Sequence, residues 1–171
     1  MEKKKAILLV NLGSPDSTSV PDVKRYLDEF LMDKYVLDVP YLVRLLIVKC
    51  FILPFRPKKS AEAYSTIWWD EGSPLIVLSK RLKALFEQQT TLPVELAMRY
   101  ANPSIHDAIK SLMKKNPNLS ELFLFPLYPH YAMATTLTVV EKTKEILKAY
   151  FPKLKLTYIE SFYDHPGYIN A

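Results

Sequence analysis

Cysteine and glycine are scarce in this chain of 171 residues, and each scarcity excludes a class of protein. Cys50 is the one cysteine, so the sequence has no internal disulfide framework and no cysteine-based metal site, and we expect a reducing, cytoplasmic setting. Cys50 lies in an apolar run and is expected to be a small buried hydrophobe. Three glycines do not supply the G-x-G-x-x-G dinucleotide fingerprint or the G-x-x-x-x-G-K-[ST] phosphate loop.

Long hydrophobic runs are also missing. A membrane-spanning helix needs about 20 apolar residues, and the longest candidate here, Tyr41–Leu53, has 13 between two prolines. This stretch could dock on a membrane surface, line an apolar pocket or form a buried helix, and burial is the preferred interpretation. The apolar segment near the start, Ala6–Val10, is too short for a signal peptide, and none is expected.

The charge excess is mild and does not indicate a nucleic-acid partner. The net charge of +5 suits an anionic small ligand or an anionic membrane surface. The sequence contains no helix-turn-helix, finger or aromatic-plus-basic sheet motif, so no nucleic acid is predicted. The apolar fraction of 49% and the charged fraction of 24% are ordinary for a globular domain with a core.

Apolar runs alternate with helical patterns along the chain, which is typical of right-handed βαβ units and a parallel sheet. We predict a flavodoxin-like or Rossmann-like, doubly wound α/β fold for residues 1–171, with a four-stranded parallel sheet in the order 2-1-3-4. The expected strands are 6–11, 94–98, 122–127 and 154–159, and the expected helices are 20–32, 40–54, 60–67, 74–88, 103–115 and 135–150. The last residues, 165–171, resemble the start of another helix, so we expect a truncated N-terminal domain.

Ligands of such sheets bind outside the carboxyl ends of the strands, so the residues after each strand are the candidates. Gly13 follows the first strand and permits a tight turn or a close approach of a ligand. Arg99 follows the second strand, where a guanidinium suits an anionic or planar ligand. His130, in the stiff loop after the third strand, could bind metal, shuttle protons or be a hydrogen-bonded structural group. Thr135-Thr136 offer a cap for the next helix.

The long excursion between the first two strands holds a further candidate. Arg56, Lys58 and Lys59 form a basic cluster directly after the apolar stretch Tyr41–Leu53. Such a pairing suits a ligand with an apolar body and carboxylate tails.

Several segments together resemble the ferrochelatase family, in the family's order and across almost the entire chain. They are Val-Asn-Leu-Gly-Ser-Pro at 10–15, Val23…Tyr26-Leu27…Phe30-Leu31-Met32-Asp33, Arg56…Lys59…Tyr64…Ile67…Gly72-Ser73-Pro74-Leu75, Met98-Arg99-Tyr100…Pro103, and Pro126-Leu127-Tyr128-Pro129-His130-Tyr131…Thr135-Thr136.

The resemblance implies a lyase of haem biosynthesis that inserts Fe²⁺ into a porphyrin. Protoporphyrin IX is the expected substrate, and coproporphyrin is the alternative that the sequence leaves open. A cobalt or nickel chelatase for a related tetrapyrrole fits the Gly-Ser-Pro-Leu and Met-Arg-Tyr segments less well. The resemblance also implies two similar Rossmann-like domains around a cleft, of which this chain is the first. The helix near Leu27–Leu31 resembles an apolar lip of that cleft, where family members approach the membrane. The implied porphyrin contacts are Leu12, Arg56, Tyr64, Ser73, Arg99, Tyr100 and Tyr128.

Metal insertion needs a cleft that bends the macrocycle, a base for two pyrrole protons and a ligand that delivers the metal. In the family the last two roles fall to a His in a Ser-x-His-x-x-Pro-like motif and to a later Glu. Neither motif occurs here, so no catalytic or metal-binding residue is assigned, and the chain alone is expected to be inactive. Its uncovered apolar surface is expected to favour a homodimer of this half.

No bound cofactor is expected in this chain. Some family members hold a [2Fe-2S] cluster with one cysteine in the loop after the third strand, where this sequence has Met133. The alternative from another class is a flavodoxin-like module that binds a cofactor or a partner protein. A visible flavin spectrum would favour that module, whereas Soret-band changes on adding porphyrin would favour the chelatase.

Overall fold

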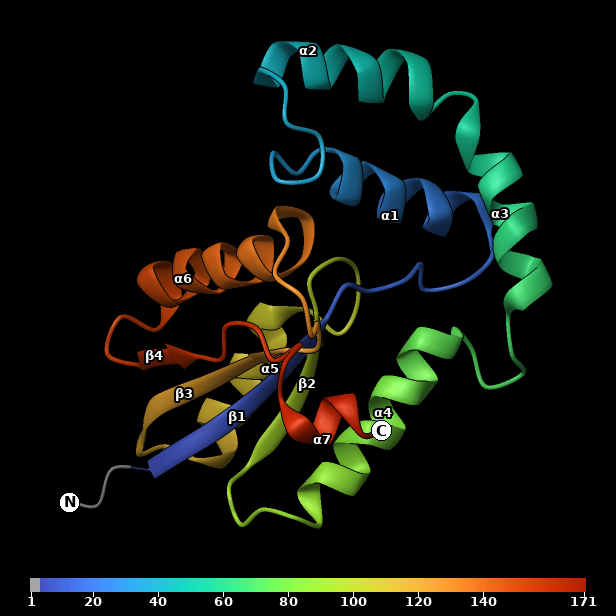
Figure 1. Ribbon diagram of the computed structural model, residues 1–171. Helices are drawn as coiled ribbons and strands as arrows, with labels where there is room; N and C mark the ends of the chain where they lie inside the picture. Colours follow the sequence, from blue (N-terminus) through green and yellow to red (C-terminus); the bar gives the residue numbers. More distant parts are fainter. Residues whose placement is uncertain (1–3) are drawn as a thin grey trace. The chain divides into compact units, whose positions relative to one another are not determined.

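The computed structural model describes residues 4–171, which group into two compact units (Figure 1). The sheet unit comprises the chain up to Leu12 together with Lys80–Arg99 and Pro103–Ala171. The helical unit comprises Gly13–Ser79 and the short segment Tyr100–Asn102.

The sheet unit contains four parallel strands in the spatial order β2-β1-β3-β4. This order and the parallel pairing confirm the α/β fold predicted from the sequence. The register places Val10 opposite both Ala97 and Pro126, so β1 is paired along both edges. The strands are β1 (Lys4–Asn11), β2 (Val94–Met98), β3 (Leu119–Pro126) and β4 (Lys155–Tyr158).

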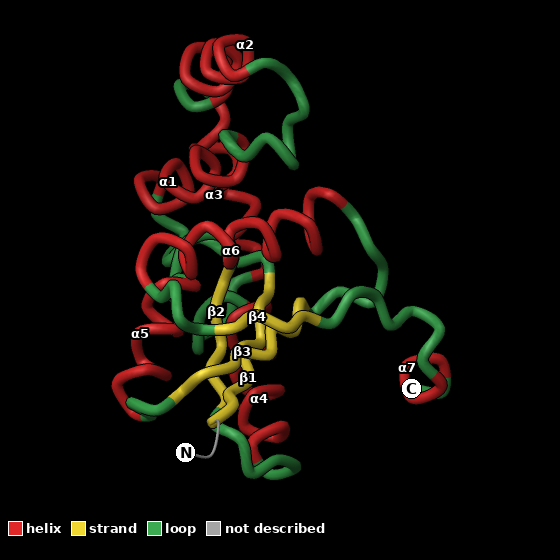
Figure 2. Tube along the Cα trace, turned by 90° about the vertical axis from the view of Figure 1, so that its left-hand side faces the viewer, coloured by secondary structure: helices red, strands yellow, loops and turns green. Residues whose placement is uncertain are grey.

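Helices cover both faces of the sheet. α5 (Ile105–Lys115) and α6 (Thr138–Tyr150) lie on one face, and the part of α4 (Pro74–Glu87) that belongs to the sheet unit lies on the other (Figure 2). Leu8, Leu122 and Leu124 are fully buried in the sheet, and Ile109 of α5 packs in the same core. Both faces of β1 are thus covered, which explains its continuous apolar run.

Local sequence signals set the starts of the helices. Ser104 caps α5, because its hydroxyl accepts a hydrogen bond from the Asp107 amide at 3.1 Å. α6 follows a single π-helical turn, η2 (Met133–Leu137), which the sequence did not predict. The predicted helix start at His165 is present as α7 (Pro166–Ile169).

The helical unit is built from α1 (Val20–Leu31), α2 (Tyr41–Leu46), the π-helix η1 (Ile47–Ile52) and α3 (Arg56–Ile67). Aromatic rings fill its interior. Tyr26 stacks on Phe30 with ring centroids 6.0 Å apart, and Tyr100 meets Phe30 edge-on at 5.3 Å. Tyr64 of α3 meets Tyr26 edge-on at 6.3 Å, so the cluster joins α1, α3 and the segment Tyr100–Asn102.

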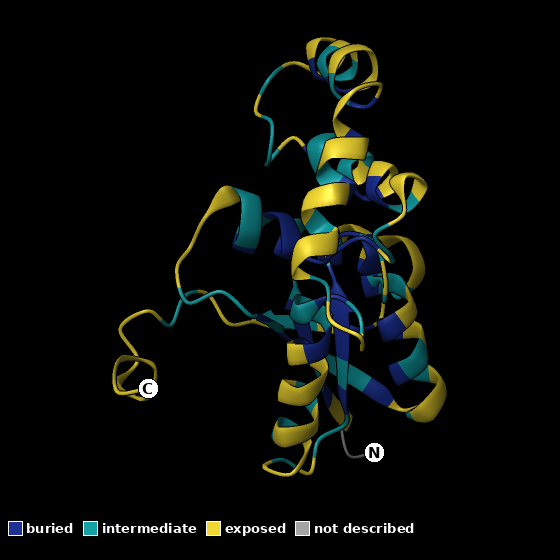
Figure 3. Cartoon of the chain, turned by 90° about the vertical axis from the view of Figure 1, so that its right-hand side faces the viewer, coloured by how far each residue is buried: buried dark blue, intermediate teal, exposed yellow. Residues whose placement is uncertain are grey.

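The continuous helix of α2 and η1 corrects two predictions. The preferred interpretation of Tyr41–Leu53 as buried is wrong for most of its apolar side chains, since Leu42 is 74% exposed and Phe51 is 65% exposed. Figure 3 shows this helix largely exposed. Cys50, predicted to be buried, is exposed as well. The physical reason is that the helix turns only one narrow stripe, including Val48, toward the unit.

Arg44 is the unexpected member of that inward stripe. It is 7% exposed, and its Nη1 donates to the carbonyls of Leu37 and Val39 at 3.2 and 3.3 Å. A charged residue takes the place that the apolar pattern assigned to hydrophobes. Over residues 4–171, no helix combines the length and the apolar character needed to cross a bilayer.

The position of the hydrophobic core in the sheet unit can be tested by a substitution that creates a cavity. Leu124→Ala should lower the free energy of unfolding by about 2–5 kcal/mol, because it leaves a cavity at a fully buried position of β3. Leu85→Ala is the matched control, since Leu85 is 62% exposed, and its effect should stay within about 0.5 kcal/mol. Urea denaturation followed by circular dichroism measures both, and equal losses would contradict the position of the core.

Candidate functional site

The first three strands in sequence end at one edge of the sheet. The amide of Arg99 donates to the carbonyl of Asn11 at 2.8 Å, and the amide of Leu127 donates to the carbonyl of Val10 at 2.8 Å. These bonds continue the parallel ladders by one residue beyond the strands. Leu12, Arg99 and Tyr128 therefore follow neighbouring strand ends at the carboxyl edge, where ligands of doubly wound sheets bind.

Arg99 is half-buried and fixed at both ends of its side chain. Its backbone is tied to β1, and its Nε donates to Thr138 Oγ1 at 2.7 Å. Thr138 is fully buried at the first residue of α6. The sequence analysis did not single out Thr138, because a threonine at a helix start has no distinctive signal beyond its propensity to cap.

Leu12 and Tyr128 are both half-buried at this edge. The amide of Leu12 bonds the side-chain oxygen of Asn11 at 2.8 Å, which turns the chain away from the strand direction. Gly13 follows with a φ of 110°, a left-handed conformation that glycine adopts without strain. This conformation agrees with the tight turn predicted at Gly13 from the sequence. Tyr128 packs against the core cluster of the sheet unit.

The loop after β3 differs from its prediction. Thr135 and Thr136 do not cap a helix, because their hydroxyls donate to the carbonyls of Ala132 and His130 at 3.4 and 3.5 Å. The amide of Leu137 reaches back five residues to the carbonyl of Ala132 at 3.2 Å, which is the bond of a π turn. Single π turns inside helices are frequent at functional sites.

His130 lies in this loop and contacts the loop after β4. Its ring stacks on Tyr163 with centroids 5.5 Å apart and an interplanar angle of 12°. The amide of Phe162 donates to the carbonyl of Pro129 at 3.0 Å, so the two loops are joined through backbone as well. These contacts match the structural interpretation of His130 rather than the metal-binding one.

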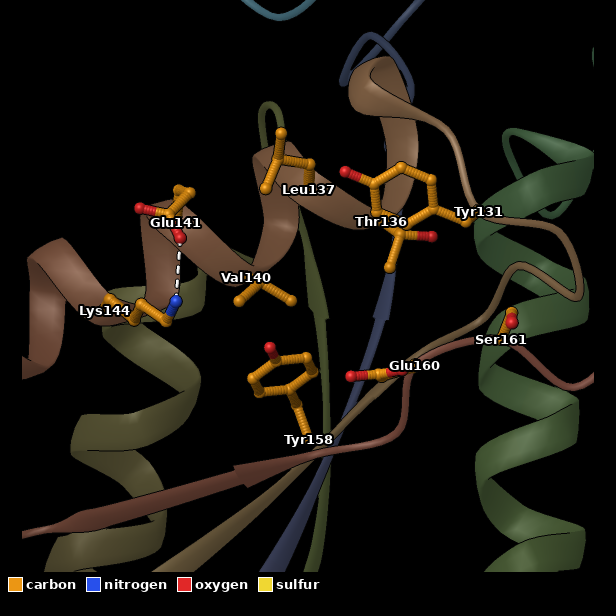
Figure 4. Close-up of a pocket in the computed structure, with 9 residues that line it drawn as sticks. All are labelled: Tyr131, Thr136, Leu137, Val140, Glu141, Lys144, Tyr158, Glu160 and Ser161. Atoms are coloured by element: carbon orange, nitrogen blue, oxygen red, sulfur yellow. Dashed lines mark hydrogen bonds and ion pairs between the residues drawn. The ribbon is translucent and has the colours of Figure 1, made fainter.

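A cavity of about 250 Å³ opens between α6 and the end of β4 (Figure 4). Glu141 and Lys144 of α6 form an ion pair at 2.8 Å on its wall. Tyr158 and Glu160 lie opposite them in the same view. The sequence analysis did not predict this cavity, because its lining comes from three separate segments of the chain.

In the helical unit, two of the three residues of the predicted basic cluster border a hollow of about 580 Å³, and Lys58 is not among its lining residues. Arg56 and Lys59, one turn apart on α3, lie beside the exposed rings of Phe51 and Phe55. The hollow thus combines cations and apolar surface, as the sequence led us to expect. Its lining residues are Phe51, Ile52, Phe55, Arg56, Lys59, Ser60 and Ala63.

Two other predicted contacts of the helical unit are inside it. Tyr100 is fully buried, and its hydroxyl donates to Asp33 Oδ2 at 2.9 Å. Ser73 is 6% exposed, and its carbonyl accepts from the Val77 amide at 2.9 Å in the first turn of α4. Direct contact of either side chain with a ligand stays a prediction.

Tyr64 is half-buried in the aromatic cluster beside Tyr26. Burial raises the pKa of Tyr64, although the hydrogen bond with Tyr26 opposes this rise. Burial also raises the pKa of Tyr26, and the neighbouring Tyr64 and Tyr100 add to the rise. Both phenols therefore stay protonated at neutral pH, and neither supplies a base.

The segment Tyr100–Asn102 has three anchors within the helical unit. Besides the bond of Tyr100 to Asp33, the amide of Ala101 donates to Glu29 Oε2 at 2.9 Å. Asn102 Nδ2 donates to both carboxylate oxygens of Asp16 at 3.1 and 3.0 Å. Ala101 has a φ of 61°, so these bonds hold a residue with a Cβ in the left-handed region.

The seven predicted contact residues divide between the two units. Leu12, Arg99 and Tyr128 belong to the sheet unit, whereas Arg56, Tyr64, Ser73 and Tyr100 belong to the helical unit. That Arg56 and Arg99 face the same crevice as Leu12 and Tyr128 stays a prediction. Over residues 4–171, the structure groups no three His, Cys, Asp or Glu side chains in a way that could hold a metal ion.

Comparison with known proteins gives one family. The family model described as ferrochelatase matches residues 4–171. A ferrochelatase of Stutzerimonas stutzeri is 48% identical over 169 residues, which cover 98% of this chain and 49% of that protein. Ferrochelatases of Pseudomonas fluorescens and Pseudomonas entomophila are 50% and 49% identical over 167 residues, covering 97% of this chain and 48% and 49% of those proteins.

The chain spans about half the length of the curated relatives it matches. Within that half, the similarity includes the residues at the carboxyl edge of the sheet and those of the helical unit. A family match over every residue that the structure describes, with relatives close to half identical, shows that this chain belongs to the ferrochelatase family.

Proposed function

We propose that the protein takes part in haem biosynthesis as a lyase that inserts Fe²⁺ into a porphyrin, with protoporphyrin IX as the substrate. The observation that carries this proposal is the family match over residues 4–171. The mixture of apolar surface and cations supports it, because a porphyrin has a flat apolar body and two carboxylate tails. Iron enters here as the second substrate and not as a resident cofactor.

The proposed porphyrin contacts are the seven residues carried over from the family: Leu12, Arg56, Tyr64, Ser73, Arg99, Tyr100 and Tyr128. Arg56 and Arg99 are the two among them that can bind carboxylates in a bidentate fork. Leu12 and Tyr128 supply apolar surface at the sheet edge. Tyr100 is buried, so its proposed role is to support the wall of the porphyrin site through its hydrogen bond to Asp33.

We further propose that residues 1–171 form the N-terminal chelatase domain and that a second domain supplies the base and the metal ligand. The coverage of about half of each relative supports this division. Burial raises the pKa values of the Tyr26 and Tyr64 phenols, so neither of these two side chains supplies the base. One such domain offers one wall, whereas bending a macrocycle requires pressure on both of its faces.

The exposed face of the α2–η1 helix supports a peripheral membrane contact. Tyr41, Leu42 and Leu46 are each more than half exposed, and Lys49 lies on the same helix. Lys49 is paired with the carboxylate of Asp28, so the support comes from the apolar side chains. A helix that exposes an apolar face can bind in the headgroup region of a bilayer. We propose a cytoplasmic protein that touches the membrane here, with no nucleic-acid partner, and a homodimer when this half stands alone.

The expected absence of an iron–sulfur cluster remains a proposal. Met133, which is 45% exposed, occupies the position where some family members have a cluster cysteine. Acid-labile sulfide, assayed on the purified full-length protein, would contradict the proposal.

Arg99→Lys should weaken binding of protoporphyrin IX about tenfold, because lysine keeps the charge but loses the planar fork. Quenching of intrinsic fluorescence by added porphyrin measures the affinity. Lys114→Met is the control, since Lys114 is an exposed cation in the last turn of α5, and it should leave the affinity unchanged. Equal effects of the two variants would exclude Arg99 as a specific contact.

The 171 residues alone should insert no metal at a measurable rate, whereas the full-length protein should turn over. Removing groups that act as a unit removes nearly all of the rate. Insertion of Zn²⁺ or Fe²⁺ into protoporphyrin, followed by fluorescence, tests both proteins side by side. Comparable rates would show that the chemistry resides within these residues and would overturn the proposed division.

The membrane contact has its own test. Leu42→Glu should reduce co-sedimentation of the protein with vesicles of phosphatidylglycerol and phosphatidylcholine, because it places a charge on a side chain that is 74% exposed. Leu85→Glu is the control, because Leu85 lies on α4 and is also largely exposed, at 62%. This variant should bind the vesicles as the parent protein does. Unchanged binding of the Leu42 variant would exclude this face.

A further inference from the structure

Thr138, a fully buried residue, bonds the guanidinium of Arg99 through its hydroxyl. Thr138 Oγ1 accepts the Nε–H of Arg99 at 2.7 Å, and both residues belong to the sheet unit. We propose that Thr138 is a positioning residue, which orients the Arg99 guanidinium so that it binds a porphyrin carboxylate end-on. This inference rests on the proposed function of Arg99 as a carboxylate contact.

The π turn fixes the place of Thr138. The amide of Thr138 bonds the carbonyls of Met133 and Thr135, and the bond from Leu137 to Ala132 closes the wide turn just before it. A β-branched side chain has few rotamers in a helix, so the direction of the hydroxyl follows from the backbone. An ordinary α-helical turn would have rotated α6 and moved this oxygen away.

Arg99 is thereby held at two points along its length. Its amide is bonded to Asn11 at the end of β1, and its Nε is bonded to Thr138 at the start of α6. An arginine side chain loses rotamer entropy when a ligand immobilises it. Here the two hydrogen bonds already order the Arg99 side chain in the folded protein. Binding a carboxylate therefore costs less conformational entropy, which strengthens the binding.

The bond at Nε also selects a binding geometry. A guanidinium can grip a carboxylate side-on through Nε and one Nη, or end-on through both Nη atoms. Thr138 occupies Nε, so only the end-on grip retains the Thr138 bond. The geometry therefore discriminates between ligand carboxylates by their angle of approach to the guanidinium. A neutral ester carries no charge and forms neither the side-on nor the end-on ion pair.

The test uses Thr138→Val and Thr138→Ser in the full-length protein. Valine matches the shape of threonine but cannot accept a hydrogen bond, and serine keeps the hydroxyl. The probes are protoporphyrin IX and its dimethyl ester. The valine variant should lose about tenfold in affinity for the diacid and nothing for the diester, whereas the serine variant should retain most of the affinity for the diacid.

A merely structural role would give a different pattern. If Thr138 acts through Arg99, then Thr138→Val should add no further loss in an Arg99→Met background. Equal losses for diacid and diester, or a full additional loss in that background, would overturn the positioning role.

A measurement without porphyrin separates this inference from the proposed function. Exchange of the Arg99 Nε–H with solvent, followed by nuclear magnetic resonance, should be slow in the parent and in the serine variant and fast in the valine variant. Fast exchange in the parent would overturn the Thr138 bond. Slow exchange in a parent that fails to bind protoporphyrin IX would instead overturn the porphyrin function assigned to Arg99.

Discussion

The pairing of β1 along both of its edges is the constraint on which the candidate site depends. Because β2 and β3 run parallel to β1 on either side, all three strands deliver their following residues to the same edge. Leu12, Arg99 and Tyr128 are far apart in sequence, yet the ladder bonds at Asn11 and Val10 place them at adjacent strand ends. A slip of one residue in the β1–β2 ladder would turn the side chains of β2 toward the opposite face and shift Arg99 relative to the end of β1.

The helical unit depends on a different interaction, the packing of aromatic rings around Tyr100. Its ring meets both Tyr26 and Phe30 edge-on, and its hydroxyl satisfies the buried carboxylate of Asp33. The other oxygen of this carboxylate accepts a hydrogen bond from the Tyr35 amide at 2.8 Å. A hydrogen bond to a charged group contributes about 1.5–3 kcal/mol. The segment Tyr100–Asn102 is therefore a structural part of the helical unit, although it directly follows Arg99 in the chain.

Two features of the chain break local rules where the proposed site lies. Ala101 adopts a left-handed backbone despite its Cβ, and η2 interrupts the helical pattern before α6. Each costs free energy that the surrounding contacts offset: Glu29 binds the amide of Ala101, and buried Thr138 follows the π turn. Strain of this kind concentrates where side chains must be held in particular orientations. The exposed apolar face of α2 and η1 is a similar departure, since most large hydrophobes of a domain are covered.

The sequence by itself determined the α/β class, the order of the four strands and the edge of the sheet to which Leu12, Arg99 and Tyr128 belong. These follow from the alternation of apolar runs and helical patterns and from the handedness of crossovers, which are properties of the local chain. The basic cluster after the apolar stretch pointed to Arg56, and the family motifs added Tyr64, Ser73 and Tyr100 of the helical unit.

Only the tertiary structure decided how deeply each of these residues is covered and what it contacts. The apolar stretch Tyr41–Leu53 predicted burial equally well for Cys50, which is exposed, and for Val48, which is buried. Nothing in the pattern around Thr138 or Asp33 distinguishes them from other surface-type polar residues. Their roles arise because residues 39 and 67 positions away along the chain come within hydrogen-bond distance. Contacts over such separations depend on how whole elements pack, and no local sequence signal encodes them.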